Sequence, residues 1–170
     1  CYFDVLICEC LVYFGRKKPF EVTQFSDSII ISFIYENIDS LYKLIKVIQA
    51  LTINLVNKGI LFRGAISYGK LIHNKELIFG PALNEAYETE TRAALYPRII
   101  LDKSILDIYK EQQMSLFEEL STENLILNCL SKDTDEKMYI DYFPNSICSL
   151  FLNIDVQIYF ENLRTIIING

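Results

Sequence analysis

The residues best suited to chemistry in this sequence are two aspartates near its start. Asp27 lies between two β-rich runs, 21–25 and 28–34, so it is expected at the tip of a hairpin on a sheet edge. Asp4 interrupts the apolar run 2–13, which predicts a buried strand, where a carboxylate is costly unless it is paired or bound to metal. If that strand lies beside the hairpin, the two carboxylates can hold two metal ions, as in phosphoryl transfer. The alternatives are an ordinary turn aspartate and a solvated strand-end aspartate.

A second group of polar residues follows in the middle of the sequence. Asn84 and Glu88 are four residues apart on a helix expected over 82–94, so they share one face of it. Arg63 is a charged residue within an apolar strand expected over 60–68, which indicates either a site or a structural ion pair. For Asn84 and Glu88, the alternative is a solvated polar face.

The periodicity of the apolar residues predicts the elements that must position these side chains. The clearest helix covers residues 37–57 and ends at Lys58-Gly59, where glycine suits the helix terminus. Further helices are expected at 103–110 and 155–168, and further strands at 70–72, 77–79, 98–101, 125–130 and 138–143. Helices separate antiparallel hairpins, which predicts a single α+β domain over residues 1–170. The expected architecture is a ferredoxin-like sandwich with a mixed, largely antiparallel sheet and helices on one face.

Composition narrows the classes of partner. The net charge of −6 disfavours a nucleic-acid-binding protein, but a single triphosphate needs only a local positive patch or metal ions. The longest apolar stretch, 142–154, is too short and too interrupted to cross a membrane. The cysteines lack zinc-ligand spacing, so reduced thiols and a cytoplasmic location are expected. Because the chain starts with Cys1, a missing N-terminal segment is also expected.

The order of the motifs resembles the class III nucleotide cyclase domain over about residues 21–101. The motifs are FSDS at 25–28, RGAI at 63–66 and GPALNEA at 80–86. The longer phrases FGPALNEAYETE, FSDSIIISF and MYIDYF resemble the pyrimidine cyclases of Pycsar antiphage defence. The fold expected above is the one that this resemblance implies.

The resemblance implies two bound ions, Mg²⁺ or Mn²⁺. The metal-binding aspartate of the family's first hairpin matches Asp27. Asp4 is the provisional match for the second metal aspartate, at the end of the first strand. Here Ile7 stands where the family has a glycine, and the interval from Asp4 to Asp27 is too short for the family's usual two helices.

The resemblance also implies roles for substrate-contacting residues. Asn84 would orient the ribose. Glu88 occupies the position of an arginine that stabilises charge on the phosphate. Arg63, Arg92 or Arg98 would therefore have to replace that arginine, or the domain is inactive. Thr23 lies at a base-reading position, where adenylyl cyclases have lysine and guanylyl cyclases have glutamate.

Thr23, Phe25 and Glu88 are therefore expected to bind substrate, and Leu77 occupies the second base-reading position. Neither purine code is present, which favours CTP or UTP as substrate. The implied reaction forms the 3′,5′-cyclic monophosphate and pyrophosphate, and the cyclic nucleotide then triggers a separate effector. The family builds its sites across a head-to-tail dimer, so a homodimer is expected.

Two alternatives stay open. One is a pseudo-cyclase that binds nucleotide or dimerises without turnover. The other is a structural α+β interaction domain that binds no nucleotide. A diguanylate cyclase is disfavoured because no G-G-D-E-F-like turn occurs in the sequence.

Overall fold

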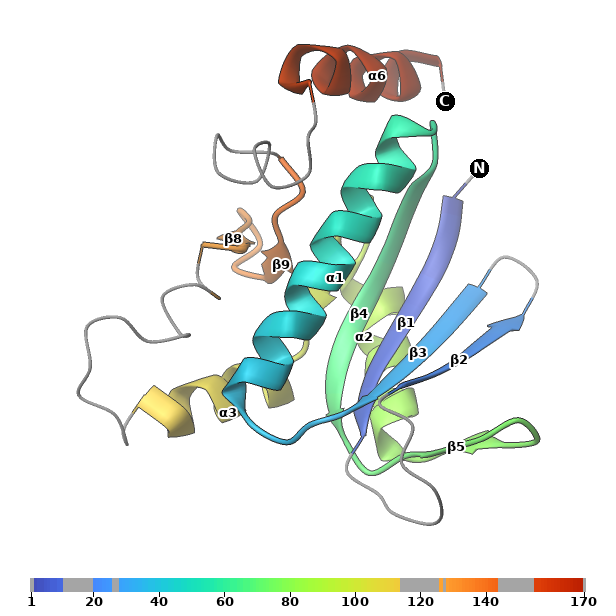
Figure 1. The fold of residues 1–170 in the computed structure, drawn as a ribbon, viewed down its shortest axis with the longest axis vertical. Coiled ribbons are helices and arrows are strands. Elements are labelled where there is room, and N and C mark those ends of the chain that lie inside the picture. The colour runs from blue at the N-terminus through green and yellow to red at the C-terminus, as the bar shows by residue number, and fades with distance from the viewer. Residues whose placement is uncertain are drawn as a thin grey trace.

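The computed structural model describes residues 20–25, 28–113, 126, 128–143 and 155–169, and the backbone of residues 2–10. Figure 1 shows the arrangement of the helices and strands. In chain order these are β1 (Tyr2–Cys10), β2 (Phe20–Phe25), β3 (Ser28–Ile34), α1 (Ile38–Asn57), β4 (Leu61–Gly69), β5 (Ile72–His73), β6 (Ile78–Phe79), α2 (Pro81–Ala93), β7 (Ile99–Leu101), α3 (Lys103–Gln113), β8 (Leu130–Lys132), β9 (Met138–Ile140) and α6 (Val156–Asn169).

The main sheet has seven strands in the order β2-β3-β1-β4-β7-β9-β8, and β5 and β6 form a separate hairpin. The prediction of a mixed sheet in an α+β fold is confirmed. Its centre is parallel, however: β1 runs parallel to β3 and β4, and β4 runs parallel to β7. The antiparallel pairs lie toward the two edges. The reason is that α1 and α2 each carry the chain back along the sheet, so the strand after each helix repeats the direction of the strand before it.

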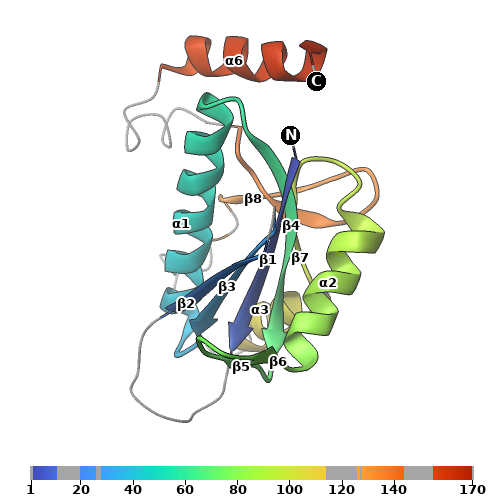
Figure 2. The ribbon, with the colours of Figure 1, turned by 90° about the vertical axis from the view of Figure 1, so that its right-hand side faces the viewer.

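The helices cover both faces of this sheet, so the prediction of helices on one face was wrong. Figure 2 shows α1 and α2 on opposite sides of the strands. In β4, Phe62 and Ile66 pack into the cluster beneath α1, whereas the Ser67 hydroxyl donates to the carbonyl of Ala82 on α2. A strand covered on both faces is apolar along most of its length. Its sequence therefore shows no alternation from which the second layer could be predicted.

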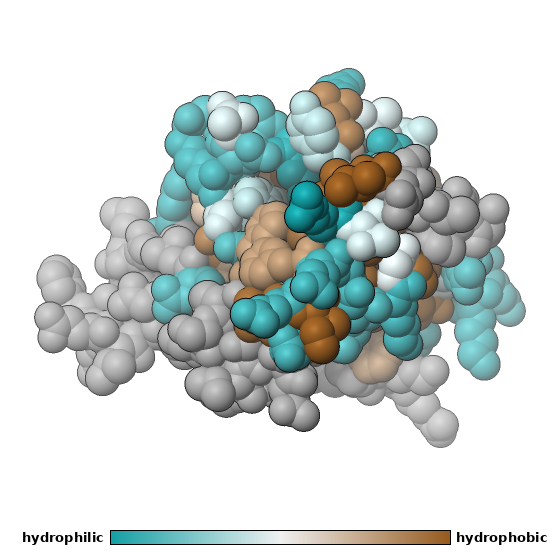
Figure 3. Space-filling model, turned by 90° about the horizontal axis from the view of Figure 1, so that it is seen from above, coloured by the Kyte–Doolittle hydropathy of each residue, from teal (hydrophilic) through white to brown (hydrophobic). Residues whose placement is uncertain are grey.

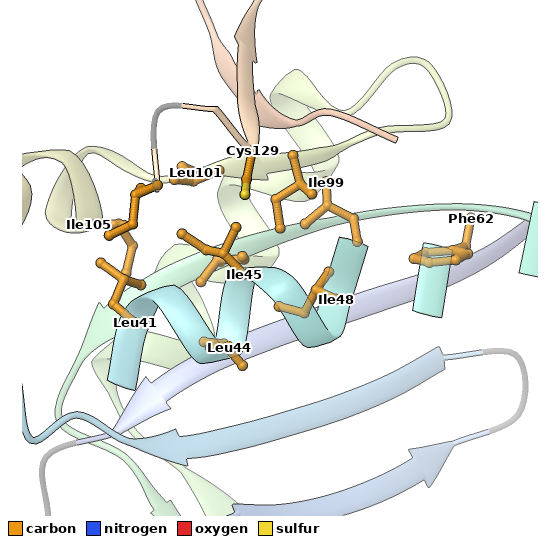
Figure 4. Packing of buried hydrophobic residues seen from close by; sticks show 12 residues of the cluster. Leu41, Leu44, Ile45, Ile48, Phe62, Ile99, Leu101, Ile105 and Cys129 are labelled. Carbon is orange, nitrogen blue, oxygen red and sulfur yellow. The ribbon is translucent and has the colours of Figure 1, made fainter. Parts of the chain in front are cut away.

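The largest buried cluster lies between α1 and the sheet. Leu41, Leu44, Ile45 and Ile48 of α1 pack against residues of β4, β7, β9 and α3 (Figure 4). Asn37 begins the helix with a capping box, in which its side chain accepts from the Ser40 amide and the Ser40 hydroxyl accepts from the Asn37 amide. The backbone amides of Asn37 and Ser40 at the start of α1 therefore have hydrogen-bond partners within the helix end itself.

The expected strand at 125–130 begins later than predicted. Within the described residues, Ile126 is helical and buried, and Asn128 and Cys129 form a turn. The strand starts at Leu130, which pairs with Ile140 in the β8–β9 hairpin. Ile126 and Cys129 belong to the core beneath α1, so their apolar character reflects burial rather than a strand.

The C-terminal helix α6 packs against the end of α1 through Tyr159 and Leu163. Two tyrosine hydroxyls tie this region together: Tyr159 donates to the carbonyl of Tyr142, and Tyr142 donates to the carbonyl of Pro97. Seen from the end that carries α6, hydrophilic and apolar residues alternate over the coloured part of the surface (Figure 3). In the part of the chain described here, no helix is both long enough and apolar enough to span a membrane.

Ionisation of these two tyrosines is expected to destabilise the folded protein at alkaline pH. Burial raises the pKa of Tyr142 to about 12 and that of Tyr159 further, so the folded protein keeps both hydroxyls protonated. Their contribution is complete below the unfolded value of about 10 and is lost as the pH rises through the folded values. We expect tyrosinate absorbance from these two residues to appear together with unfolding of α6, as followed by circular dichroism. Tyr142→Phe should weaken this dependence, and the absence of any change would contradict the assignment.

Candidate functional site

The backbone brings the two aspartate segments together. Asp4 of β1 is paired in register with Ser28, the first residue of β3 and the residue directly after Asp27. On its other side, Asp4 is paired with Arg63 of β4. The side chain of Asp4 and the whole of Asp27 lie outside the described residues. The strand adjacency that a shared carboxylate site requires is therefore present in the backbone.

The register aligns residues of β3, β1 and β4 in three rows across the sheet. The first row is Ser28, Asp4 and Arg63, the second is Ile30, Leu6 and Ala65, and the third is Ser32, Cys8 and Ser67. Successive rows are about 7 Å apart, because each step covers two residues of a strand. The helix α2 covers this face of β4, since Glu90 pairs with Arg63 and Ala82 accepts from Ser67.

Arg63 forms an ion pair with Glu90 of α2. The Arg63 Nε lies 2.8 Å from the Glu90 Oε1, and the Glu90 side chain is only 5% exposed. A buried carboxylate needs such a partner, because desolvation of an unpaired charge costs several kcal/mol. The Arg63 side chain is 37% exposed. The first row therefore carries a partly accessible guanidinium whose Nε is engaged by the protein.

The structure places Asn84 and Glu88 on the exposed surface of α2. Glu88 pairs with Arg92, one turn further along the helix, at 3.2 Å. Asn84 lies six residues before Glu90 on α2, about 9 Å of helix rise from the residue that pairs with Arg63. Asn84 lies on the exposed side of the helix, whereas Glu90 is buried against the sheet and pairs with Arg63.

Arg98 lies just before β7 and is buried, with 4% of its side chain exposed. Its guanidinium binds Asp133 and Asp135 in the β8–β9 turn and donates to the carbonyl of Ala93 at 2.8 Å. The hydrogen bond with Asp135 is the largest influence on Arg98 and raises its pKa, against the opposing effect of burial. In this structure Arg98 joins the end of α2 to the β8–β9 hairpin.

Thr23 lies on β2 opposite Ile30, so it is on the face of the sheet that α2 covers. Its hydroxyl lies 2.8 Å from the Nε2 of His73, and the Nδ1 of the same ring lies 2.8 Å from the hydroxyl of Ser32. Phe25, two residues further along β2, is 55% exposed. The β5–β6 hairpin thus contacts the expected base-reading residue through His73.

Sequence reasoning missed His73 and Ser32. As the only histidine, in an expected turn, His73 offered no partner set that could indicate a role. Its two partners are 50 and 41 residues away in the chain. No pattern among neighbouring residues of the sequence indicates a contact between residues so far apart. The contacts of His73 are evident only from the packing of the hairpin on β2 and β3.

A metal site is not assembled by the described side chains, which contain no group of three or more histidine, cysteine, aspartate or glutamate residues able to hold an ion. The side chains of Asp4 and Asp27 are outside that set. The thiol of Cys129 is buried. Comparison with known proteins found no matching family model, no matching curated protein and no matching solved structure.

Proposed function

We propose that this protein is a metal-dependent nucleotide cyclase that converts CTP or UTP to the 3′,5′-cyclic monophosphate and pyrophosphate. The observation that carries the proposal is the register of β1 beside β3, which sets Asp4 next to the residue that follows Asp27. Together with the cyclase-like motifs of the sequence, this adjacency supports a site that would use the carboxylates of Asp4 and Asp27. Carboxylate oxygens suit Mg²⁺ and Mn²⁺, which prefer oxygen ligands.

In this proposal Asp4 and Asp27 would hold the ions, and bound ions would supply neutralising charge for the phosphate oxygens. The ribose 3′-hydroxyl passes its proton to water and its oxygen forms a bond to the α-phosphorus. The bond from that phosphorus to the bridging oxygen breaks and releases pyrophosphate. Arg63 adds positive charge in the same row as Asp4. Thr23 and Phe25 bind the base side of the substrate, and the catalytic effect comes from positioning and electrostatics.

The exposed positions of Asn84 and Glu88 on α2 support a site assembled from two copies of the chain. Because these side chains are not on the face of α2 that contacts the sheet, they would contact a substrate held by the aspartates of the partner. Arg92, paired with Glu88, would then lie at the same interface. The proposed product is a messenger that acts on a separate antiviral effector.

The test is incubation of the purified protein with ATP, GTP, CTP or UTP and Mn²⁺, with products identified by chromatography and mass. We expect a cyclic pyrimidine nucleotide from the wild type. Asp27→Ala and Asp4→Ala should reduce its formation by at least about a hundredfold, as is usual when a group that stabilises transition-state charge is lost. Asp107→Ala is the matched control, because it removes a carboxylate of α3 that is 48% exposed.

Product formation that survives Asp27→Ala would refute the assigned metal site. A folded wild type that makes no cyclic product from any of the four nucleotides would refute the cyclase proposal. Circular dichroism and the thermal midpoint of each variant show whether a loss of product reflects a loss of fold.

A nucleotide-binding pseudo-cyclase is the second candidate. It is favoured by the ion pairs of Arg63, Arg92 and Arg98, each of which binds a carboxylate of its own chain. This candidate predicts that a pyrimidine triphosphate with Mn²⁺ raises the thermal midpoint while no product forms. A structural interaction domain predicts no such rise.

A further inference from the structure

The contact between the β5–β6 hairpin and the main sheet is centred on one polar residue. His73 faces the sheet, and both nitrogens of its ring lie 2.8 Å from hydroxyls, of Thr23 on β2 and of Ser32 on β3. Ser32 is 6% exposed, so its hydroxyl has little access to water. The ring therefore connects a buried hydroxyl to a half-buried one in a continuous chain of hydrogen bonds.

A neutral imidazole in this chain has one donor and one acceptor. If Nδ1 carries the proton, it donates to Ser32, and Nε2 accepts from the Thr23 hydroxyl. If Nε2 carries the proton, it donates to Thr23, and Nδ1 accepts from Ser32. Burial lowers the pKa of His73, against the raising effect of Glu21, which favours the neutral ring. The tautomer of His73 thus determines whether Thr23 is a donor or an acceptor within the chain.

The same choice determines what Thr23 can offer to a ligand. A hydroxyl that donates to His73 has only lone pairs left, and these suit an amino group such as that of cytosine. A hydroxyl that accepts from His73 keeps its own proton, which suits a carbonyl oxygen such as O4 of uracil. A hydroxyl without this partner can rotate and serve both bases.

We infer that His73 is a positioning residue that orients the Thr23 hydroxyl, and that it thereby determines the preference between cytosine and uracil nucleotides. This inference rests on the proposed function, because it takes Thr23 to contact the base. Ser32 is the anchor of the arrangement, since its hydroxyl lies 2.8 Å from Nδ1 and holds that side of the ring. A charged side chain at the base-reading position needs no second residue to orient it, because a lysine can only donate hydrogen bonds and an ionised glutamate can only accept them.

The hairpin has other contacts that hold it in place when the ring nitrogens are removed. Ile78, the cross-strand partner of His73, packs against the buried cluster of Ile30, Leu71, Ala82 and Ala86. The turn of the hairpin is held by the side chain of Asn74, which accepts from the amides of Glu76 and Leu77 at 2.9 Å. His73→Phe therefore removes both polar contacts while keeping an aromatic ring of similar size.

The experiment measures kcat and KM for CTP and for UTP separately, with Mn²⁺, in the wild type, His73→Phe, Ser32→Ala and the double variant. We expect the wild type to prefer one nucleotide and His73→Phe to bring the ratio of the two kcat/KM values about tenfold closer to one, the effect of one hydrogen bond. Ser32→Ala should also shift this ratio, but it should add nothing in the presence of His73→Phe, because both act through one ring.

Asn74→Ala is the control for damage to the hairpin. It should lower the kcat/KM values for both nucleotides by the same factor, and a merely structural role of His73 would give the same result in His73→Phe. A selective wild type whose ratio is unchanged in His73→Phe and Ser32→Ala would overturn the inference and leave the cyclase proposal standing. A wild type that makes no cyclic product would instead overturn the proposed function, and the inference with it. If His73→Phe does not fold, the ratio in Ser32→Ala decides.

Discussion

Gly80→Ala is expected to lower the free energy of unfolding by about 4 kcal/mol, from the combined costs of backbone strain and overpacking. Gly80 lies at the start of α2 with a φ of 154°, which side-chain-bearing residues rarely adopt. An added Cβ would lie 2.3 Å from the carbonyl oxygen of Lys70 and 2.8 Å from the Cα of Leu71. Both are backbone atoms, so the clash cannot be relieved by rotating a side chain.

The matched control for Gly80 is Gly69→Ala. Its Cβ would meet the Cβ of Ala82 at 3.4 Å, an ordinary contact, and its φ is not in the positive range. Urea unfolding followed by circular dichroism should show a loss several times smaller for Gly69→Ala. If Gly80→Ala and Gly69→Ala lost the same free energy of unfolding, the close approach of Gly80 to the backbone of Lys70 and Leu71 would be contradicted. Because Gly80 precedes α2, its replacement is also expected to displace Asn84 and reduce any activity that depends on it.

Arg98→Met is expected to lower the free energy of unfolding by about 3 kcal/mol, the lower end of the range for breaking a buried ion pair. The guanidinium is almost fully buried and binds two carboxylates and the carbonyl of Ala93. Methionine fills part of the volume but leaves Asp133 and Asp135 without their cation. Their side chains are 33% and 44% exposed, so water offsets part of that cost.

Arg92→Met provides the comparison for Arg98. Its guanidinium is 77% exposed and pairs with an exposed Glu88, an interaction that contributes less than about 1 kcal/mol. Chemical unfolding of both variants at the same ionic strength separates the two cases. A loss for Arg98→Met no larger than that for Arg92→Met would show that the buried pairs do not stabilise the β8–β9 hairpin.

Much of the local structure could be predicted from the sequence. Gly80-Pro81 indicated the start of α2, since proline suits a helix start and the residue before it avoids helical backbone. The apolar stripe of α1 and the short polar break between residues 25 and 28 likewise predicted a helix and two paired strands that the structure contains. These features depend on neighbours a few residues apart, so they are encoded locally.

The candidate site was predictable only in part. Asp4 and Asp27 were predicted as candidate metal ligands from their residue type and the apolar residues around them. The structure adds the backbone pairing of Asp4 with Ser28. For Arg63 the sequence indicated either a site or, at least as strongly, a structural ion pair, and the packing of α2 supplies Glu90 as the partner. The interaction of His73 with Thr23 and Ser32 was not predicted at all.

By itself the sequence determined the elements, the α+β class and the residues with chemical potential, because hydrophobic periodicity records which side of a segment is buried. Only the tertiary structure decided that β1 runs parallel to its neighbours, that helices cover both faces, and that Thr23 meets His73. Periodicity does not record what covers a buried side or in which direction a neighbouring strand runs. Those choices depend on contacts between segments tens of residues apart, which form only when the helical crossovers close on the sheet.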